Sequence, residues 1–406
     1  MFAWTKDQLA VRDAVRSFVD KEIRPHQDEL EHGDLPPYDL IRKFFSTFGL
    51  DALAAESFDR SIAAAEAREA GEEPPASGGD GMDPAMAVLP QIELVKVSMG
   101  IPAAIGVSIG LAAGTINASG SIEQRKRWAR DLATFEKVGA WAITEPDAGS
   151  DAFGGMRTTV KPDGDDFVLN GQKTFITNGP YADTIVVYAK LDDGSGLDRR
   201  DQPVLTFVLD SGMDGLEQSK PLKKMGMNSS PTGQLFFDNV RLGRDRLLEG
   251  RPGSDGRESA RSNFMVERVG IATLSLGVIE ECLRLCVDYA KERTLWGKPI
   301  GDLQLIQLKL AEMEVARINV QNMVFKGIAA RRGEVSMDLA EASAIKLYSS
   351  KAATDVAMEA VQLFGGNGYM AEYRVEQLAR DAKSLMIYAG SNEVQVTHVA
   401  KGLLRR

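Results

Sequence analysis

Few residue patterns in this 406-residue chain have the spacing of a common catalytic or metal-binding motif. The three histidines, His26, His32 and His398, are scattered, and neither cysteine has a histidine nearby, so no metal-ligand spacing is present. The sequence contains no Gly-x-Ser-x-Gly elbow, no Walker loop and no clear Gly-x-Gly-x-x-Gly after a strand. These absences disfavour simple hydrolase, kinase and nicotinamide-dependent chemistry.

Four polar and glycine-rich segments remain as candidates for chemistry. They are Trp141-Ala-Ile-Thr-Glu-Pro-Asp-Ala-Gly-Ser-Asp, Thr174-Phe-Ile-Thr-Asn-Gly, Gln362-Leu-Phe-Gly-Gly-Asn-Gly-Tyr and Arg380-Asp-Ala-Lys-Ser-Leu-Met-Ile-Tyr-Ala-Gly-Ser-Asn-Glu. The glycine cluster in the third could bring bare backbone amides close to a pyrophosphate, although such glycines more often end a helix. Each segment alone is weak evidence, and their combination carries the argument.

Together these segments resemble the acyl-CoA dehydrogenases. The matching stretches are Ile143-Thr-Glu-Pro-Asp-Ala-Gly-Ser-Asp, Phe175-Ile-Thr-Asn-Gly, Arg293-Thr-Leu-Trp-Gly-Lys-Pro-Ile, Gly365-Gly-Asn-Gly and Arg380-Asp-Ala-Lys. The similarity runs in order from about residue 5 to the C-terminus and fails mainly across 57–90. The resemblance implies FAD as cofactor, an acyl-CoA substrate, an electron-transfer flavoprotein as electron acceptor, and a homotetramer.

The resemblance also assigns binding residues by motif position. Those implied to line the flavin and acyl site from the β-domain are Trp141, Ile143, Thr144, Gly149, Ser150, Phe175 and Thr177. Those implied to hold the rest of FAD, partly across a subunit interface, are Arg293, Trp296, Gln304, Gln362, Gly365 and Gly366, with Ser391 and Glu393 in a further turn. The implied substrate contacts are Ser150, Arg268 and Gly390.

The catalytic base departs from the commonest family pattern. The segment before the last helix often reads Tyr-Glu-Gly-Thr, with Glu as the base, whereas this chain reads Tyr388-Ala-Gly-Ser. Alanine cannot accept a proton, but its backbone amide can still polarise a thioester carbonyl. Isovaleryl- and long-chain-type members carry the base on the first bundle helix, before an arginine, and Phe264-Met-Val-Glu-Arg matches that arrangement. We therefore predict Glu267 as the base and the amide of Ala389 as a carbonyl donor.

The alternative for Glu267 is an acid stabilised by the helix dipole near an N-terminus, with Arg268 its solvated neighbour. The predicted reaction is the α,β-dehydrogenation of an acyl-CoA to a 2,3-enoyl-CoA, in which Glu267 takes the α proton and FAD N5 the β hydride. Other possibilities on the same fold are an acyl oxidase, an acyl-carrier-protein dehydrogenase or a non-catalytic flavin-binding relative. Glu267 argues against the last of these.

Hydrophobic periodicity predicts a mainly α protein with a central β-domain. We expect an N-terminal helical domain over 1–138, a middle β-barrel or sandwich over 139–255, and a C-terminal four-helix bundle over 256–406. The bundle helices are predicted at 264–293, 302–333, 338–363 and 392–404, after a linker over 249–262. Residues 57–84, rich in Ala, Glu, Gly and Pro, predict a mobile acidic surface insertion.

Composition limits the partners and the location. The net charge of −10 disfavours nucleic acid. Cys282 and Cys286, four residues apart in an apolar segment, are predicted to be small buried hydrophobes, and two thiols suit a reducing compartment. Without a secretory pattern at the start, the cytoplasm is the expected location. The uncharged stretch 97–119 has the length of a membrane span, but its glycines and polar residues favour a buried central helix.

Overall fold

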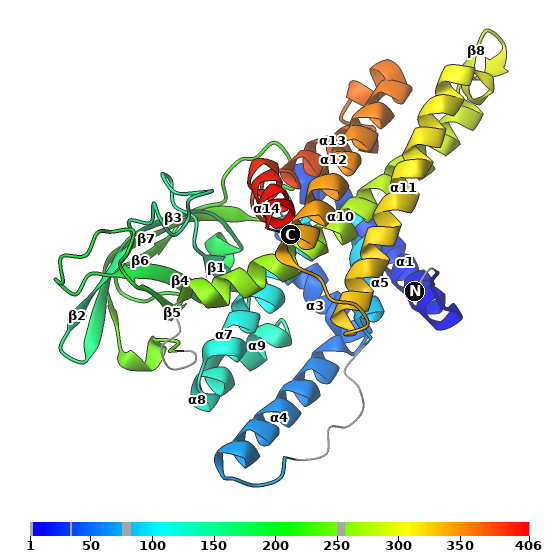
Figure 1. Cartoon of the computed structure of the whole chain (residues 1–406). Helices are drawn as coiled ribbons and strands as arrows, with labels where there is room; N and C mark the ends of the chain where they lie inside the picture. The colour runs from blue at the N-terminus through cyan, green and yellow to red at the C-terminus, as the bar shows by residue number, and fades with distance from the viewer. Residues whose placement is uncertain (1–2, 33–34, 75–82, 250–255, 406) are drawn as a thin grey trace.

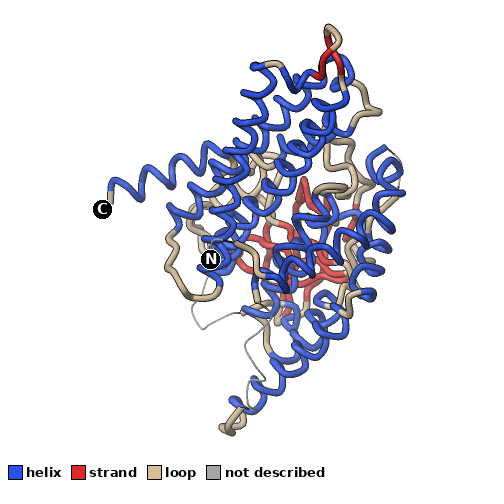
Figure 2. Tube along the Cα trace, turned by 90° about the vertical axis from the view of Figure 1, so that its right-hand side faces the viewer, coloured by secondary structure: helices blue, strands red, loops and turns tan. Residues whose placement is uncertain are grey.

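The computed structural model describes residues 3–32, 35–74, 83–249 and 256–405. Helices dominate at both ends of the chain, and a curled sheet lies between them in sequence (Figure 1). This order, helical then β then helical, confirms the predicted fold class. Figure 1 shows the sheet on one side of the helices, and Figure 2 shows the C-terminal helix extending away from the body.

The N-terminal part consists of helices, several of which continue into short π or 3-10 segments. They are α1 (Lys6–Phe18), η1 (Val19–Ile23), η2 (Arg24–His26), α2 (Gln27–His32), α3 (Tyr38–Thr47), α4 (Leu50–Glu69), α5 (Pro84–Val95), α6 (Gly100–Ile105), η3 (Gly106–Ala113), α7 (Gly114–Ser119), α8 (Ile122–Gln124), η4 (Arg125–Ala129) and α9 (Arg130–Ala133). A capping box between Thr5 and Gln8 starts α1. Helix α3 begins at Tyr38, directly after Pro37, as the sequence indicates.

Helix α4 shows that the predicted mobile insertion over 57–84 is wrong for its first half. Residues 50–69 form one helix, and Phe58 and Ile62, one turn apart, are buried in a cluster with Ala112 and Trp128. Alanine-rich sequence favours helix, and two apolar residues four apart give that helix a buried side. The high acidic content concealed this pattern. Residues 75–82 lie outside the described part of the chain.

The uncharged run Gly100–Ser119 forms the continuous helical path α6, η3 and α7. It is long and apolar enough to cross a membrane, but half of it is buried inside the protein. The Ser108 hydroxyl accepts a hydrogen bond from Gly139 N–H at 2.8 Å, and η3 packs on β1 and α9. These contacts are those of a core helix.

The middle of the chain forms one curled seven-stranded sheet. Its strands are β1 (Gly139–Ala142), β2 (Thr159–Asp163), β3 (Asp166–Thr177), β4 (Thr184–Leu191), β5 (Val204–Asp210), β6 (Leu216–Gln218) and β7 (Thr232–Leu242). The order is β1-β4-β2-β3-β7-β6, and β5 pairs antiparallel with β4. Along β4, Ile185 and Val187 enter the core inside the sheet, while Val186 and Tyr188 pack against the helices. The alternation of a strand thus joins two cores.

The C-terminal part contains the four predicted helices and one more. Its elements are α10 (Gly256–Glu292), the hairpin β8 (Thr294–Leu295) and β9 (Lys298–Pro299), α11 (Gln304–Arg331), α12 (Leu339–Phe364), α13 (Arg374–Ser384) and α14 (Asn392–Leu404). Helix α13 was not predicted. Helix α10 already begins at Gly256, so the linker interpretation is wrong from there on; a Cβ at Gly256 would lie 2.6 Å from Thr206 Oγ1 on β5. Cys282 and Cys286 are free and buried in α10, as predicted.

Asn178 fastens the β-domain to the N-terminal helices. Its backbone is left-handed, with φ 63°, and its side chain is fully buried. Its Nδ2 donates to the carbonyls of Ala104 at 3.0 Å and Gly139 at 2.9 Å, and its Oδ1 accepts from the Tyr38 hydroxyl at 3.2 Å. The Asn178 side chain, in the Thr-Asn-Gly segment, therefore joins the β-domain to the N-terminal helices by hydrogen bonds.

Glu31 joins the two ends of the chain. Its buried carboxylate accepts hydrogen bonds from Gln377 Nε2 and Arg380 Nη1, both at 2.8 Å and nearly 350 residues away in sequence. Asn228 Nδ2 also donates to it, from the loop before β7. One carboxylate thus holds α2, α13 and the β-domain together.

Replacing Asn178 with alanine removes its three buried side-chain hydrogen bonds, to the carbonyls of Ala104 and Gly139 and from the Tyr38 hydroxyl. We expect Asn178→Ala to lower the free energy of unfolding by about 2–4 kcal/mol, because each lost hydrogen bond contributes about 0.5–1.5 kcal/mol. Urea unfolding followed by circular dichroism measures this loss. Asn170→Ala, which removes two exposed hydrogen bonds between Asn170 and Asn239, is the matched control and should change stability by less than about 1 kcal/mol. Equal effects of the two substitutions would contradict the role of Asn178 in joining the two domains.

Candidate active site

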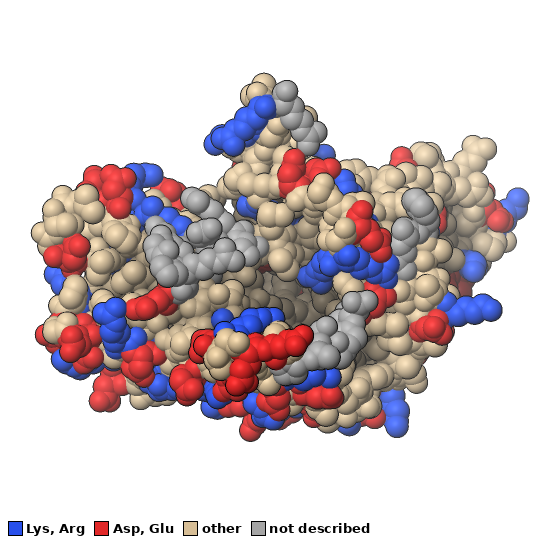
Figure 3. Space-filling view, turned by 60° about the horizontal axis from the view of Figure 1, so that its bottom comes forward, with Lys and Arg blue, Asp and Glu red and all other residues tan. Residues whose placement is uncertain are grey.

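A large cleft of about 2390 Å³ lies between the β-domain and the helices. Its walls come from α4 to α6 and η3, from the segment after β1, from the end of β3, and from α10 and the turn before α14. The lining is mostly apolar, and Figure 3 shows a hollow of largely uncharged surface between charged outer faces. The cleft brings together twelve of the predicted site residues: Trp141, Ile143, Thr144, Gly149, Ser150, Phe175, Thr177, Glu267, Arg268, Ala389, Gly390 and Ser391.

The β-domain wall depends on a buried ion pair. Lys173 Nζ is fully buried and donates to Glu145 Oε1 at 2.8 Å and to the Ile143 carbonyl at 3.0 Å. The Glu145 carboxylate also accepts the backbone N–H groups of Arg157 and Thr158. Burial lowers the pKa of Lys173 to about 8, against the opposing pull of Glu145. The pair fixes the path of residues 143–149 along the cleft.

The hydroxyl of Thr115 connects the β-domain wall to helix α10. It accepts a hydrogen bond from Trp141 Nε1 at 3.1 Å and one from Asn263 Nδ2 at 2.8 Å, and it donates to the Leu111 carbonyl at 2.7 Å. The Trp141 ring also packs edge-on against Phe264, with centroids 5.7 Å apart. These contacts set where the first turns of α10 lie relative to β1.

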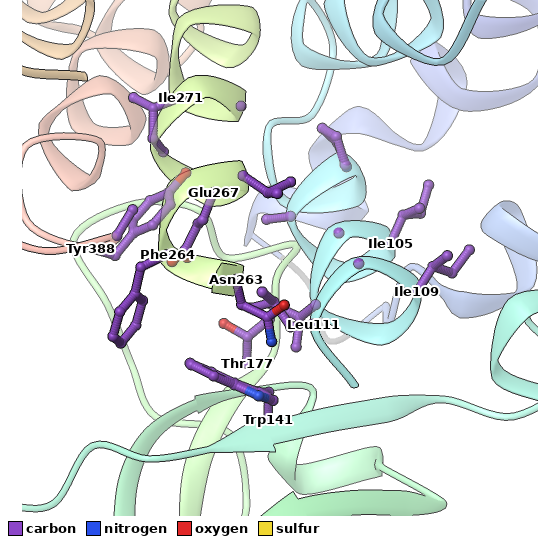
Figure 4. Close-up of a pocket in the computed structure, with 18 of the residues that line it drawn as sticks. Ile105, Ile109, Leu111, Trp141, Thr177, Asn263, Phe264, Glu267, Ile271 and Tyr388 are labelled. Carbon is purple, nitrogen blue, oxygen red and sulfur yellow. The ribbon is translucent and has the colours of Figure 1, made fainter. Parts of the chain in front are cut away.

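Glu267 projects from α10 into the cleft, and the alternative of a solvated helix acid does not fit this position. Figure 4 shows it on α10 beside Tyr388 and Phe264, with Ile105 and Ile109 on the helix at the opposite side of the pocket. Protein encloses the carboxyl except toward the cleft, and this burial raises its pKa to about 7, although the charges of Arg268 and Lys346 act in the opposite direction. A carboxyl with a pKa near 7 suits a general base at neutral pH.

The turn before α14 has an unusual backbone. Ala389 adopts φ 58° and Gly390 φ 77°, and left-handed backbone is costly for a residue with a side chain. Gln395 Nε2 donates to both of their carbonyls, at 3.2 and 2.8 Å. Arg268 Nη2 lies 3.9 Å from where a Cβ on Gly390 would be. Left-handed backbone at a cleft wall is typical of a functional site.

Arg268 is buried, yet within the described residues its Nε and Nη1 have no hydrogen-bond partner. Burial lowers its pKa from the usual value, while Glu267 acts to raise it. A buried guanidinium with open donors facing a cleft is suited to a polar or anionic ligand atom.

A second group of predicted cofactor residues does not line this cleft. Arg293, Trp296 and Gln304 lie at the β8–β9 end of the bundle, remote from the β-domain (Figure 1). Gln362, Gly365 and Gly366 are at the same end, because Phe364 stacks on Tyr289 with ring centroids 4.0 Å apart. Trp296 is 84% exposed, and no atom lies within 4 Å of a Cβ placed on Gly365 or Gly366. Glu393 is also outside the cleft, on the exposed side of α14.

Four further residues belong to the site and were not predicted from the sequence: Thr115, Asn263, Lys346 and Tyr388. The cleft is lined directly by Asn263 and Tyr388, and the other two act behind its walls. The one available signal was Lys346, a lysine on the apolar side of a predicted helix, which is unusual unless the charge has a role.

The cleft fits a flavin. Hydroxyls of Thr144, Ser150 and Thr177 line one wall, next to Trp141, and Gly149 has no atom within 4 Å of where its Cβ would lie. The Phe175 ring is 67% exposed at the cleft, and its backbone is left-handed, with φ 58°. This exposed ring offers an apolar face against which a flat ligand ring could pack. A planar apolar ring with a polar chain suits this combination of surfaces.

Comparison with known proteins agrees with this geometry. The chain matches the family models for the acyl-CoA dehydrogenase N-terminal domain over residues 5–136, middle domain over 140–240 and C-terminal domain over 254–404. An acyl-CoA dehydrogenase of Bacillus subtilis (strain 168) is 34% identical over 400 residues, covering 98% of each chain. Among solved structures, acyl-CoA dehydrogenase from Geobacillus kaustophilus has a TM-score of 0.85 at 30% identity, covering 98% of each chain. Butyryl-CoA dehydrogenase from Megasphaera elsdenii has 0.83 at 31%, covering both chains fully.

A carboxylate facing a cleft between a curled sheet and a helical domain is the arrangement of a flavoprotein dehydrogenase. The chain belongs to the acyl-CoA dehydrogenase family, which uses FAD. It is an enzyme of acyl-CoA dehydrogenation.

Removing one charge of the buried pair leaves Lys173 uncompensated. We expect Glu145→Gln to lower the free energy of unfolding by about 3–5 kcal/mol, the usual cost of breaking a buried ion pair from one side. Chemical denaturation of the purified protein measures the loss. Glu217→Gln, on the exposed face of β6, is the control and should have little effect. A Glu145→Gln variant as stable as this control would contradict the role assigned to the pair.

Proposed function

We propose that Glu267 is the catalytic base of an acyl-CoA dehydrogenase that converts an acyl-CoA to the 2,3-enoyl-CoA. The main support for this proposal is the position of the Glu267 carboxylate. It lines the cleft from α10, and burial raises its pKa to about 7. The position that would otherwise hold the base is Ala389, which has no titratable group. The placement corresponds to that of isovaleryl- and long-chain-type enzymes.

In the proposed mechanism, the thioester carbonyl accepts a hydrogen bond from Ala389 N–H, which makes the α proton more acidic. Within the described residues, this N–H makes no other hydrogen bond. The Glu267 carboxylate takes the α proton as the substrate excludes water from the cleft. Arg268, with its open donors next to Gly390, binds the substrate beside the thioester. FAD, when bound along the β-domain wall, supplies the acceptor for the hydride that leaves the β carbon.

The acyl group is proposed to occupy the apolar end of the cleft beyond Glu267. That end is lined by side chains of α4, α5, α6 and η3, including Leu53, Pro90, Leu94, Ile105 and Ile109. Apolar walls of this kind bind a hydrocarbon chain through removal of apolar surface from water.

We propose an electron-transfer flavoprotein as the acceptor and the cytoplasm as the location. Relatives of this chain include a subunit of a caffeyl-CoA reductase–Etf complex from Acetobacterium woodii, at 31% identity. The two free, buried thiols suit a reducing compartment. An acyl-carrier-protein oxidase also shares the fold, with a TM-score of 0.82 at 27% identity. Oxygen consumption during turnover distinguishes that chemistry from the proposed one.

We propose a homotetramer in which a neighbouring chain completes the FAD site. Six predicted cofactor residues lie at the far end of the bundle, away from the cleft. Helix α11 carries an exposed apolar stripe of Leu305, Leu308, Val315 and Ile318, whose spacings of three and seven place them on one side. An apolar helix face of this kind is typical of an interface.

Glu267→Gln should retain FAD and bind acyl-CoA but lose proton abstraction, with kcat falling by about 10²–10⁴-fold. Anaerobic bleaching of the flavin by acyl-CoA measures this. Asp288→Asn, an exposed carboxylate on the same helix, should leave the rate unchanged. In the wild type, kcat should rise with pH through about 7, as Glu267 ionises. Undiminished reduction of the glutamine variant would remove Glu267 from the mechanism.

The substitution Glu267→Gln should also stabilise the folded protein at pH 7 and above. Because the folded-state pKa of Glu267 lies near 7 and the unfolded value near 4.5, its stabilising contribution is full below about pH 4.5 and is lost as pH rises through 7. We therefore expect Glu267→Gln to gain about 1–3 kcal/mol over the wild type at pH 8, and much less at pH 4.5. A pH-independent difference would contradict this linkage.

Charging the stripe on α11 should disrupt the assembly. We expect Leu308→Glu combined with Val315→Glu to reduce the mass from tetramer to a smaller species and to lower FAD content at least about tenfold, since a buried unpaired charge costs several kcal/mol. Size-exclusion chromatography with light scattering measures the mass. Val335→Glu, at an exposed apolar position after α11, is the matched control. A tetramer that survives in the double variant would refute this interface.

A further inference from the structure

Lys346 is a fully buried lysine in the middle of α12. Its Nζ donates to Asn392 Oδ1 at 2.8 Å, and the Ser350 hydroxyl donates to the same oxygen at 3.1 Å. Within the described residues, no carboxylate lies within ion-pair distance of it. Burying an ammonium group opposite a neutral amide is costly, and burial lowers the pKa of Lys346 to about 8. A methionine or leucine would fill this core position at a lower free-energy cost. The buried charge therefore indicates a role other than packing.

Asn392 is the first residue of α14 and follows the left-handed turn directly. Its backbone N–H donates to the Met386 carbonyl at 3.0 Å, so the chain on both sides of the turn is fixed. Ala389 and Gly390 are held from the other side by Gln395. The turn is therefore clamped between Lys346, through Asn392, and Gln395. Such clamping is needed, because Ala389 would relax out of its costly conformation if the start of α14 could shift.

We propose that Lys346 is a positioning residue for α-proton removal: through Asn392 it fixes the turn that presents the Ala389 amide to the thioester carbonyl, and it places a cation beside the base Glu267. The inference rests on the proposed function. The charged and titratable groups that face Glu267 come from three elements: Arg268 on α10, Lys346 on α12 and Tyr388 before α14. Of these, only Lys346 is joined by a hydrogen bond to the helix that carries the turn.

The charge of Lys346 acts on Glu267 in the direction that keeps the carboxylate ionised. The same charge lies close enough to Glu393, on the outer side of α14, to be influenced by it. Losing the ammonium group should raise the pKa of Glu267 and slow ionisation of the substrate together. Substrate binding should change little, because Lys346 lies behind the turn and outside the cleft lining.

A structural role and a positioning role predict different results for Lys346→Met. Methionine fills a similar volume without a charge, so a lysine that only fills space in the core should be replaced with activity unchanged, and a lysine whose hydrogen bond is needed only for folding should lose melting temperature and activity together. A positioning lysine should give a variant of equal or higher melting temperature, with kcat lowered at least about tenfold and the pH profile of kcat moved to higher pH. Lys351→Met, at an exposed position on the same helix, is the matched control.

The probe for the proton step is 3-thiaoctanoyl-CoA, which carries sulfur in place of the β carbon. Its α proton can be removed, but no β hydride can leave, so the reaction stops at the enolate, detected by its long-wavelength absorbance against the flavin. In the holoenzyme, Lys346→Met should reduce this absorbance at saturating probe at least about tenfold, with probe affinity within about threefold of wild type. Asn392→Asp, which keeps an acceptor for Nζ, should retain most of it.

Four outcomes decide the inference. A large loss of enolate absorbance in Lys346→Met, with unchanged melting temperature and probe affinity and with most of the absorbance kept in Asn392→Asp, supports the positioning role of Lys346. Wild-type absorbance in Lys346→Met overturns it while leaving Glu267 as the base. Equal losses of absorbance and of melting temperature in both Lys346→Met and Asn392→Asp assign the lysine to the fold alone and also overturn it. A wild-type enzyme that forms no enolate absorbance with 3-thiaoctanoyl-CoA and bleaches with no acyl-CoA overturns the proposed function, and this inference with it.

Discussion

Helix α10 is the element on which the arrangement of the protein depends. It begins against β5, packs on α5 and α7 of the N-terminal helices, and runs between α11 and α12 to the β8–β9 hairpin. The packing of one 37-residue helix against all three parts leaves little freedom for any of them to move separately. Glu267 is on this helix where it passes the cleft. The proposed base is therefore held by the core packing, and the Thr115 hydroxyl joins the start of this helix to Trp141 of β1.

The proposed base and the proposed carbonyl donor are on two elements with different physical demands. On α10 the demand is desolvation, since Glu267 is useful only where water is scarce enough to raise its pKa. Before α14 the demand is conformational, since the amide of Ala389 is available only while the backbone stays left-handed. Each requirement costs stability. The buried hydrogen bonds of Lys346 and Gln395 hold the turn in its left-handed conformation.

Much of this architecture could be predicted from the sequence, because its elements have strong periodic patterns. The middle β-domain and the helices that correspond to α10, α11 and α12 were predicted from hydrophobic periodicity. Helix α4 was missed since its buried side consists mainly of Phe58 and Ile62 within an acidic, alanine-rich run. Helix α13 was missed because it is short and highly charged, and its buried face is evident only once Val375 and Leu378 meet the core.

The candidate site was predicted through the resemblance, residue by residue, and the cleft gathers most of those residues. The residues that hold them in place could not be found this way. Lys346 and Asn392 are 46 positions apart, and Thr115 is 148 positions from Asn263, so no local pattern connects them. Hydrogen bonds across such separations depend on the tertiary fold, which neither periodicity nor a motif encodes.

The hydrogen bonds of Glu31 join residues that are synthesised at very different times. Its carboxylate is made early, but its partners on α13 follow nearly 350 residues later. At the usual pace of about 5–20 residues per second, roughly 17–70 seconds pass before those partners have been made. During that interval the N-terminal helices carry an acidic side chain that lacks its two donors on α13 and has, among the residues that the structure describes, only Asn228 as a partner. The full packing around Glu31 should therefore form only after α13 has been made.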